Sequence, residues 1–171
     1  DLKPEGFNFK AGQYIMFQCP LVSDPKDCQA RAYSIASAPE DDELIFVIKL
    51  VEGGRMSTFV TDALKPGTEI EMQGPLGIFT LEKSLGKDLL LVCTATGNAP
   101  FHSMLKSALA AGDTRKMDMI FGVRHEEDLF WVDEFESMAS AHENFNFHTI
   151  LSKPKGEWSG HTGHVQDIIT E

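Results

Sequence analysis

The side chains best suited to ligand chemistry lie together at Arg31-Ala32-Tyr33-Ser34, which supplies a cation, an aromatic ring and a hydroxyl group. On an extended segment side chains alternate between faces, so we expect Arg31 and Tyr33 to point one way and Ala32 and Ser34 the other. An arginine presents a rigid fork of donors that suits a diphosphate, and a tyrosine presents a flat face on which a planar ring can stack. A surface ion pair and ordinary strand packing explain the same residues, so this tetrapeptide needs support from elsewhere in the chain.

A second candidate site, suited to phosphate, begins at Gly53 and Gly54. Glycines let the backbone approach a ligand closely, and the unpaired N–H groups at the start of a helix attract an anion. Apolar residues at helical spacing predict a helix over residues 56–64, ending before Pro66. Ser57 is placed to cap this helix or to bond a phosphate oxygen. A hairpin turn followed by a capped helix is the alternative interpretation.

The third candidate is the stretch Thr94-Ala95-Thr96-Gly97-Asn98-Ala99-Pro100, which follows the apolar run 89–93. Such a run is typical of a buried parallel strand, and residues 100–111 have the spacing of a helix. Open parallel sheets bind ligands in the crevice beyond the carboxyl ends of their strands. The stretch therefore lies where a dinucleotide is expected.

These segments and Gly74-Pro75-Leu76-Gly77 together resemble the ferredoxin–NADP reductase superfamily in order and spacing. Members bind FAD in an antiparallel barrel and a nicotinamide dinucleotide in an adjoining α/β domain. The resemblance implies that Arg31 pairs with the FAD diphosphate, Tyr33 stacks on the isoalloxazine ring and Ser34 lies near its N5 atom. The implied flavin-binding set is Arg31, Ala32, Tyr33, Ser34, Val47, Lys49, Gly53, Gly54, Met56 and Ser57, with the strand around Val47 and Lys49 acting largely through backbone.

The family motif Gly-Thr-Gly-x-Ala-Pro implies that Thr96 and Gly97 contact the nicotinamide dinucleotide. This chain departs from the motif at Ala95, where a glycine is usual, and at Asn98, where an apolar residue is usual. Relatives hold the adenosine half of the cofactor at positions that correspond here to Arg124, Ser152 and Lys153. The two cations suit a 2′-phosphate and hence NADPH, but NADH-using relatives carry basic residues here as well, so both cofactors stay open.

The activity implied by the resemblance is hydride transfer from NAD(P)H to FAD, followed by electron transfer to a ferredoxin, a flavodoxin or an oxygenase component. Ser34 and Thr96 would lie nearest the transfer, as the catalytic residues. Two other interpretations remain: a non-catalytic flavin- or nucleotide-binding subunit of a larger electron-transfer complex, and an interaction module without a cofactor.

The predicted secondary structure differs between the two halves of the chain. In the first half we expect strands over 12–18, 44–51 and 68–72, with a turn at 24–27. In the second half strands over 89–93, 117–123 and 145–151 alternate with helices over 100–111 and 129–141, which is typical of a parallel sheet. We therefore expect a small antiparallel FAD-binding β-barrel over residues 1–84 and a doubly wound NAD(P)-binding α/β domain over 85–171. By the family pattern, the first strand of the barrel and the final strands of the sheet are missing.

Bulk composition narrows the function classes. The 171 residues carry a net charge of −11, which argues against a nucleic-acid partner because a polyanion would be repelled. No stretch approaches the ~20 apolar residues needed to span a bilayer, and no signal peptide is recognised. Three scattered cysteines are too few for a zinc site or a [2Fe–2S] cluster. We expect no metal site, and a cytoplasmic location by default.

Overall fold

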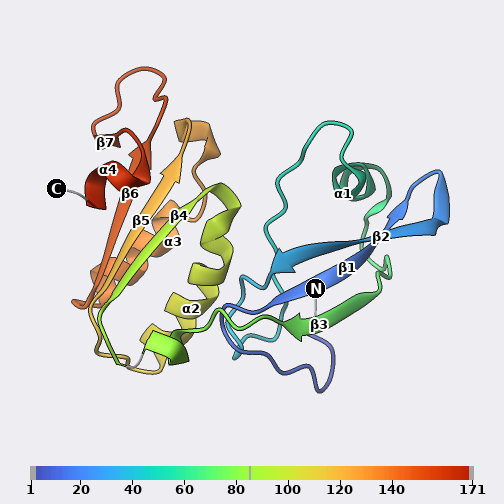
Figure 1. Ribbon diagram of the computed structural model, residues 1–171, viewed down its shortest axis with the longest axis horizontal. Coiled ribbons are helices and arrows are strands. Elements are labelled where there is room, and N and C mark those ends of the chain that lie inside the picture. The colour runs from blue at the N-terminus through green and yellow to red at the C-terminus, as the bar shows by residue number, and fades with distance from the viewer. Residues whose placement is uncertain (1–2, 85, 170–171) are drawn as a thin grey trace. The chain divides into compact units, whose positions relative to one another are not determined.

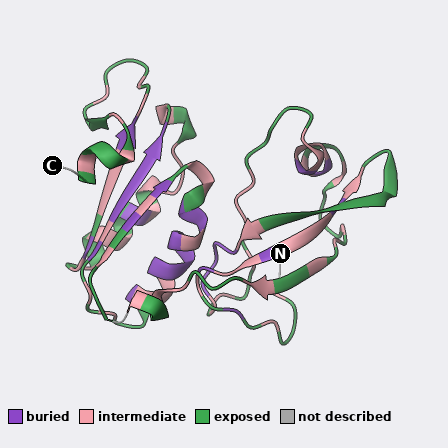
Figure 2. Cartoon of the chain, viewed as in Figure 1, coloured by how far each residue is buried: buried purple, intermediate pink, exposed green. Residues whose placement is uncertain are grey.

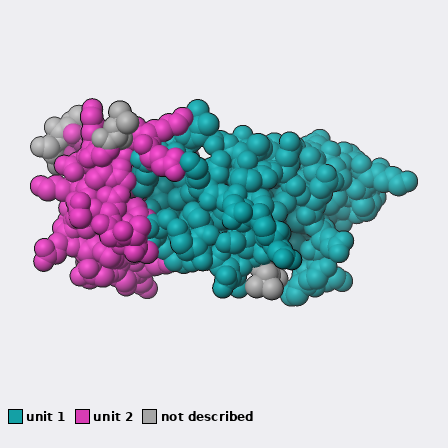
Figure 3. Space-filling model, turned by 90° about the horizontal axis from the view of Figure 1, so that it is seen from below, with its two compact units in different colours: residues 1–81, 99–107 teal, residues 82–98, 108–171 magenta. Residues whose placement is uncertain are grey.

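The computed structural model describes residues 3–84 and 86–169, and the chain folds into two compact units (Figures 1 and 3). Unit 1 comprises Asp1–Leu81 together with Ala99–Ser107. Unit 2 comprises Glu82–Asn98 and Ala108–Glu171. The helix that contains residues 99–107 therefore belongs mainly to unit 1. The predicted domain boundary falls at residue 85, which lies outside the described residues.

Unit 1 is built on an antiparallel sheet of three strands, β1 (Tyr14–Leu21), β2 (Asp24–Ser34) and β3 (Met72–Leu76), in the order β2-β1-β3. The central strand β1 buries alternate side chains, with Ile15 and Cys19 fully enclosed. Two apolar clusters form around these two residues. The antiparallel class predicted for the first half is confirmed.

Three local predictions in unit 1 are wrong. The predicted turn at 24–27 lies within β2, and the chain reverses instead at Val22 and Ser23. Pro25 is tolerated because β2 is an edge strand of the described sheet, where a missing N–H breaks no ladder bond. The strand predicted over 68–72 starts only at Met72.

The third error is the strand predicted over residues 44–51. Leu44, Phe46 and Ile48 pack against the two clusters, so the alternating pattern is present. Within the described part of the chain, however, no regular ladder follows it beyond the bond from the Ala36 N–H to the Ile45 carbonyl. A strand needs a backbone partner as well as a side-chain pattern, and β-propensity reports only the second.

A short helical segment links these strands. α1 (Arg55–Thr58) continues directly into the wider π-helical turn η1 (Phe59–Ala63), which confirms the predicted helix over 56–64 within a residue at each end. Met56 and Phe59 are buried against Cys19, so packing of one apolar face holds this segment on the sheet.

Unit 2 contains a parallel sheet of four strands in the order β4-β5-β6-β7. Its strands are β4 (Leu89–Thr94), β5 (Met117–Val123), β6 (Phe145–Leu151) and β7 (His161–Thr162). The helices of this half of the chain are α2 (Ala99–Ala110), which belongs mainly to unit 1, α3 (Val132–Ala141) and α4 (Val165–Ile169). The 3₁₀ turns are η2 (Leu81–Ser84), η3 (Ala95–Asn98) and η4 (Glu126–Asp128). The predicted strands and the first helix match these elements within one residue.

Helices cover both faces of this sheet. On one face Phe135 of α3 stacks on Phe147 of β6, with ring centroids 5.0 Å apart. On the other face Val165 of α4 lies against Gly122 of β5, where an added Cβ would approach the valine to 2.5 Å. Buried residues follow β5 and one face of α2 (Figure 2). The doubly wound α/β class predicted for the second half is confirmed.

The third helix begins later than predicted. α3 starts at Val132, and Trp131 before it has φ 58°, a left-handed conformation that interrupts helical backbone. Leu129 instead closes the 3₁₀ turn η4 through a bond from its N–H to the Glu126 carbonyl. Apolar spacing alone did not reveal this change of direction.

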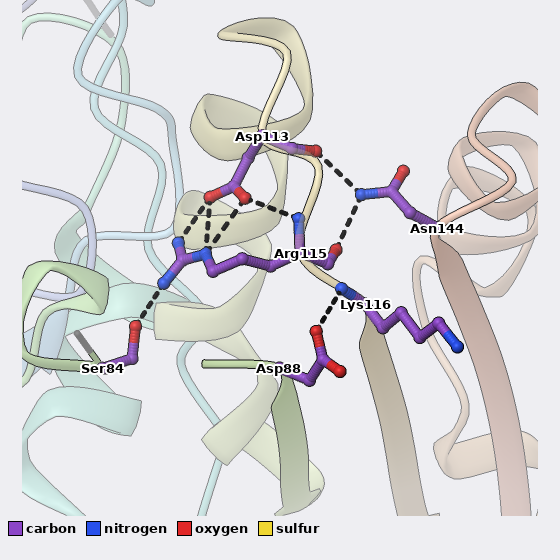
Figure 4. A network of polar contacts seen from close by, with 6 residues as sticks. All are labelled: Ser84, Asp88, Asp113, Arg115, Lys116 and Asn144. Atoms are coloured by element: carbon purple, nitrogen blue, oxygen red, sulfur yellow. Dashed lines mark hydrogen bonds and ion pairs between the residues drawn. The ribbon is translucent and has the colours of Figure 1, made fainter. Parts of the chain in front are cut away.

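A polar network joins the amino-terminal ends of the parallel strands (Figure 4). The Arg115 guanidinium bonds both carboxylate oxygens of Asp113, with Nε 3.0 and 2.9 Å from them, and also the Ser84 hydroxyl. Asn144 Nδ2 donates to the carbonyls of Asp113 and Arg115, both at 2.8 Å. The Lys116 N–H donates to Asp88 at 2.9 Å. These contacts fix the starts of β4, β5 and β6 relative to one another.

We expect Asp113→Asn to destabilise the protein at neutral pH and to have little effect in acid. Hydrogen bonds from Arg115 outweigh burial and hold the pKa of Asp113 below its ordinary value. The stabilisation is therefore fully present above that ordinary value and is lost as pH falls through the lower folded value. Urea unfolding should give a difference of about 1–3 kcal/mol near pH 7 that shrinks below about pH 4. The same difference at both pH values, or an equal effect of Glu143→Gln on the exposed surface, would contradict this account.

Candidate functional site

Three segments of unit 1 meet around one apolar cluster. The cluster consists of Cys19, Met56 and Phe59. Tyr33 of β2 packs against it, as does Ile48, which lies between the predicted contacts Val47 and Lys49. The Val47 side chain is half-buried and that of Lys49 is exposed. The predicted flavin residues on β2, on the 47–49 segment and on α1 are thus brought together in one unit.

Two guanidinium groups lie on this side of β2. Arg31 is exposed and bonds Gln29 Oε1 at 2.7 Å. Arg55, with 13% of its side chain exposed, bonds the Asp27 carbonyl and lies 3.1 Å from the Asp27 carboxylate. Burial raises the pKa of the Cys19 thiol, while Arg55 and Arg31 act in the opposite direction. Of the two cations on this surface, Arg55 is paired with a carboxylate and Arg31 has no carboxylate partner among the described residues.

Tyr33 presents its ring beside this surface. The ring is half-buried and lies 6.1 Å from the Phe17 ring, centroid to centroid, at 47°. Burial, together with Cys19, raises the pKa of Tyr33 above its ordinary value, so the phenol is neutral at physiological pH. Ala32 and the half-buried Ser34 alternate with it on the strand, as expected from the sequence.

The loop before α1 is shaped by its glycines. Gly53 has φ +68°, and a Cβ on Gly54 would lie 3.0 Å from both the Ser57 hydroxyl and the Val51 carbonyl. Ser57 Oγ accepts a hydrogen bond from the Val51 N–H at 2.7 Å and does not cap α1, so the capping alternative is wrong. Met56 buries its side chain in the apolar cluster, which leaves its backbone as the part that a phosphate can contact.

The predicted nicotinamide segment forms η3, between β4 and α2. Ala95 has φ 47°, at the position where the family motif has glycine, which costs an L-residue about 1 kcal/mol. Thr96 is half-buried and Gly97 is exposed. Among the described residues, a Cβ on Gly97 would meet only Cys93, at an ordinary 3.6 Å, so packing against them does not require glycine here. Burial raises the pKa of Cys93 to about 12, which makes it an inert packing residue.

Asn98 is the residue of this loop that sequence reasoning did not assign to the site. Its side chain is fully buried, and among the described residues neither amide atom has a hydrogen-bond partner. Buried amides in native proteins are normally satisfied, so an orphan amide beside a predicted dinucleotide loop fits a polar ligand. The signal in the sequence was that asparagine stands at position 98, where the family motif has an apolar residue.

The predicted adenosine-binding residues lie at adjacent strand ends. The Ser152 N–H bonds the Val123 carbonyl at 3.0 Å and the Lys153 N–H bonds the Arg124 carbonyl at 2.9 Å, so β5 and β6 stay side by side past their ends. Arg124 and Lys153 are exposed, and no described residue forms an ion pair with either. His125, which the sequence did not single out, contacts the Lys153 carbonyl through its Nδ1.

These donor sets fit the two cofactors that the sequence predicts. An exposed guanidinium group beside a glycine-bounded helix start suits a diphosphate, and a half-buried aromatic ring suits a planar flavin. Adjacent cations at the carboxyl edge of a parallel sheet suit a phosphorylated ribose. Across the described residues, no cluster of histidine, cysteine and acidic side chains could hold a metal ion.

Two family models match the chain. The oxidoreductase FAD-binding domain matches residues 2–81 and the oxidoreductase NAD-binding domain matches residues 91–171. Ferredoxin–NADP reductase B of Sorangium cellulosum is 36% identical over 98% of this chain and 67% of its own length. The toluate 1,2-dioxygenase electron transfer component of Pseudomonas putida is 38% identical over 94% of this chain and 46% of its own length. The chain belongs to the ferredoxin–NADP reductase family.

Solved structures agree with this assignment. A ferredoxin NADP⁺ reductase from Neisseria gonorrhoeae with bound FAD and NADP has a TM-score of 0.80 at 27% identity, covering 99% of this chain and 67% of that one. The Amycolatopsis cytochrome P450 reductase has a TM-score of 0.82 at 28% identity, covering 97% of this chain and 50% of that one. This chain spans between about half and two thirds of these relatives. No helix in the described part of the chain is long and apolar enough to cross a membrane.

Proposed function

We propose that this protein is a flavin-dependent oxidoreductase that takes a hydride from NADPH or NADH and passes electrons to a redox protein. The observation that carries the proposal is that Tyr33, two residues after Arg31 on β2, and Met56 at the start of α1 meet in one cluster, in a chain of this family. Residues 1–84 are proposed as the FAD-binding part and residues 85–171 as the NAD(P)-binding part, in keeping with the two family matches.

In this proposal the residues of the chain bind the two cofactors and orient their reacting rings. Arg31, Gly53, Gly54 and the start of α1 would hold the FAD diphosphate, while Tyr33 would pack against the ring system. The chemistry supplied by the bound cofactors is hydride transfer from nicotinamide to flavin and release of single electrons. Ser34 would hydrogen-bond beside the flavin, and Thr96 would position the nicotinamide.

The electron acceptor is proposed to be a ferredoxin, a flavodoxin or an oxygenase component. Relatives include the phenol 2-monooxygenase reductase component of a Pseudomonas strain and the naphthalene 1,2-dioxygenase reductase component of Pseudomonas putida. The net charge of −11 would steer this protein toward a basic docking surface. We propose a cytoplasmic location, because the reducing cytoplasm keeps thiols free and all three cysteines of the chain are free.

Titration of the purified protein with FAD tests the flavin half of this proposal. We expect saturable binding, detected as quenching of flavin fluorescence, with one FAD per chain. Protein that takes up no FAD would refute the flavin assignment and leave the interaction module as the better reading.

A second candidate function is a non-catalytic flavin-binding subunit of an electron-transfer complex. Ala95 in a left-handed conformation favours it, because the family's dinucleotide motif has a glycine at this position. Binding of FAD without binding of either nicotinamide nucleotide, measured by calorimetry, would decide for this alternative.

We expect Lys153→Ala to raise the apparent KM for NADPH about tenfold with little change for NADH. The reason is that a charge-assisted contact to the 2′-phosphate would be lost, and NADH has no such phosphate. Steady-state kinetics with both nucleotides measure this. Lys155→Ala is the matched control, because Lys155 already pairs with Glu127 at 2.9 Å and should leave both KM values unchanged. An equal effect of Lys153→Ala on both nucleotides would contradict a 2′-phosphate contact.

A further inference from the structure

Helix α2 is docked within unit 1 onto the segment that follows Ser34. His102 Nδ1 lies 2.7 Å from the carbonyl oxygen of Ala36, and Lys106 Nζ lies 2.8 Å from Asp41 Oδ2. His102 and Lys106 are four residues apart and so share one face of the helix. Sequence reasoning gave none of these residues a role, and the proposed function does not use them.

The segment that receives His102 is enclosed. Ile35, Ala36 and Ser37 have no exposed surface. The Ile35 N–H donates to the Gln13 carbonyl at 3.0 Å and the Ala36 N–H to the Ile45 carbonyl at 2.8 Å. His102, itself 2% exposed, supplies a donor to the Ala36 carbonyl. A buried carbonyl that loses its donor is costly, so removal of this donor should shift the segment.

The carboxyl-terminal end of the same segment, around Asp41, is held by a different side chain of α2. Asp41 Oδ2 accepts from the Ala38 N–H at 2.8 Å and from Lys106. Burial alone would raise the pKa of Asp41, but these bonds and the nearby His102 lower it overall, so this carboxylate is ionised at neutral pH. A third contact from α2 runs from the Ser107 hydroxyl to Glu40 Oε1 at 3.0 Å, and of the three the one from His102 lies closest in sequence to Tyr33 and Ser34.

We propose that His102 is a positioning residue for the flavin site. By donating from Nδ1 to the Ala36 carbonyl, it fixes the end of β2 that presents Tyr33 and Ser34. A carbonyl oxygen only accepts, so the imidazole must carry a proton on Nδ1. The inference rests on the proposed function, because Tyr33 and Ser34 are the proposed flavin contacts.

Fluorescence titration with FAD tests this on the wild-type protein and three variants. In His102→Asn the amide nitrogen stands close to the position of Nδ1 and keeps the donor. In His102→Gln the amide lies one carbon farther out, and His102→Leu has no donor. We expect the Asn variant to bind FAD within about twofold of wild type, and the Gln and Leu variants to bind roughly three- to tenfold more weakly. The visible circular dichroism of bound flavin should change in the same order.

Lys106→Met separates this role from general docking of the helix, because it removes a contact to the same segment and leaves the Ala36 carbonyl bonded. We expect it to lower the melting temperature and to leave FAD affinity nearly unchanged. Equal FAD affinity in all three His102 variants and wild type would overturn the inference, as would an Asn variant as weak as the Leu variant. The comparison of Asn with Gln suffices if the Leu variant does not fold. Failure of the wild-type protein to bind FAD would overturn the proposed function as well.

Discussion

Replacement of Arg31 by alanine should raise the dissociation constant for FAD by roughly ten- to a hundredfold. A fork of N–H donors on a diphosphate makes charge-assisted bonds of about 1.5–3 kcal/mol, and each 1.4 kcal/mol is tenfold in affinity. Arg31 is exposed on β2, and its hydrogen bonds run to Gln29 and Ala30 on its own strand. Its loss should therefore leave the stability of the protein within about 0.5 kcal/mol. Fluorescence titration and a thermal melt measure the two quantities.

Lys26→Ala is the control for this change. Lys26 is another exposed cation of β2, but it lies five residues from Arg31, in the part of the strand where the register with β1 shifts. It should leave FAD affinity unchanged. An equal loss in the two variants would show a general charge effect, and no loss in Arg31→Ala would remove Arg31 from the site.

Replacement of Gly12 by alanine should destabilise the protein by about 3–5 kcal/mol. A Cβ at this position would lie 2.1 Å from the Phe79 carbonyl oxygen and 2.3 Å from the Met104 methyl group. The residue also has φ +97°, which strains any L-residue. Overlap with backbone cannot be relieved by a change of rotamer, so strain and overpacking add. Urea unfolding of the two proteins measures the difference.

Gly67→Ala isolates the conformational part of this cost. Gly67 has φ +89°, yet no atom of the described residues lies within 4 Å of an added Cβ. We expect a loss of only about 1–2 kcal/mol there. Similar losses at the two positions would mean that Gly12 is required for its backbone conformation and not because of crowding against Phe79.

The parallel sheet was the most predictable part of the fold. Residues 89–93 are recognised in sequence because a strand buried on both faces needs a continuous apolar run. Residues 117–123 and 145–151 are recognised because they alternate with helical patterns. Residues 44–51 have the same β-propensity, but strand formation there depends on a backbone partner that the local sequence does not specify. The left-handed Trp131 was likewise missed, since no glycine or proline stands there. The turn at Val22 and Ser23 was placed two residues too late, at Asp24-Pro25.

The residues of the candidate site also fall into two groups: some have a role that residue type predicts, and others have a role that depends on the folded structure. The types of Arg31, Tyr33 and Lys153 reveal the chemistry, because guanidinium, ring and ammonium groups act through properties that each residue carries alone. Asn98 and His102 acquire their significance only from burial and from partners, which appear only after folding. Ser57 is a residue whose type misleads. A serine at a helix start suggests a cap, but the Ser57 hydroxyl accepts a hydrogen bond from the Val51 N–H in the preceding loop.

Anaerobic titration of the FAD-loaded protein with NADPH and with NADH tests the central claim most directly. The account predicts that at least one nucleotide bleaches the visible absorbance of the flavin, and that an oxidised ferredoxin or another one-electron acceptor restores it. Flavin that stays oxidised with both nucleotides, although dithionite reduces it, would contradict the proposed oxidoreductase function.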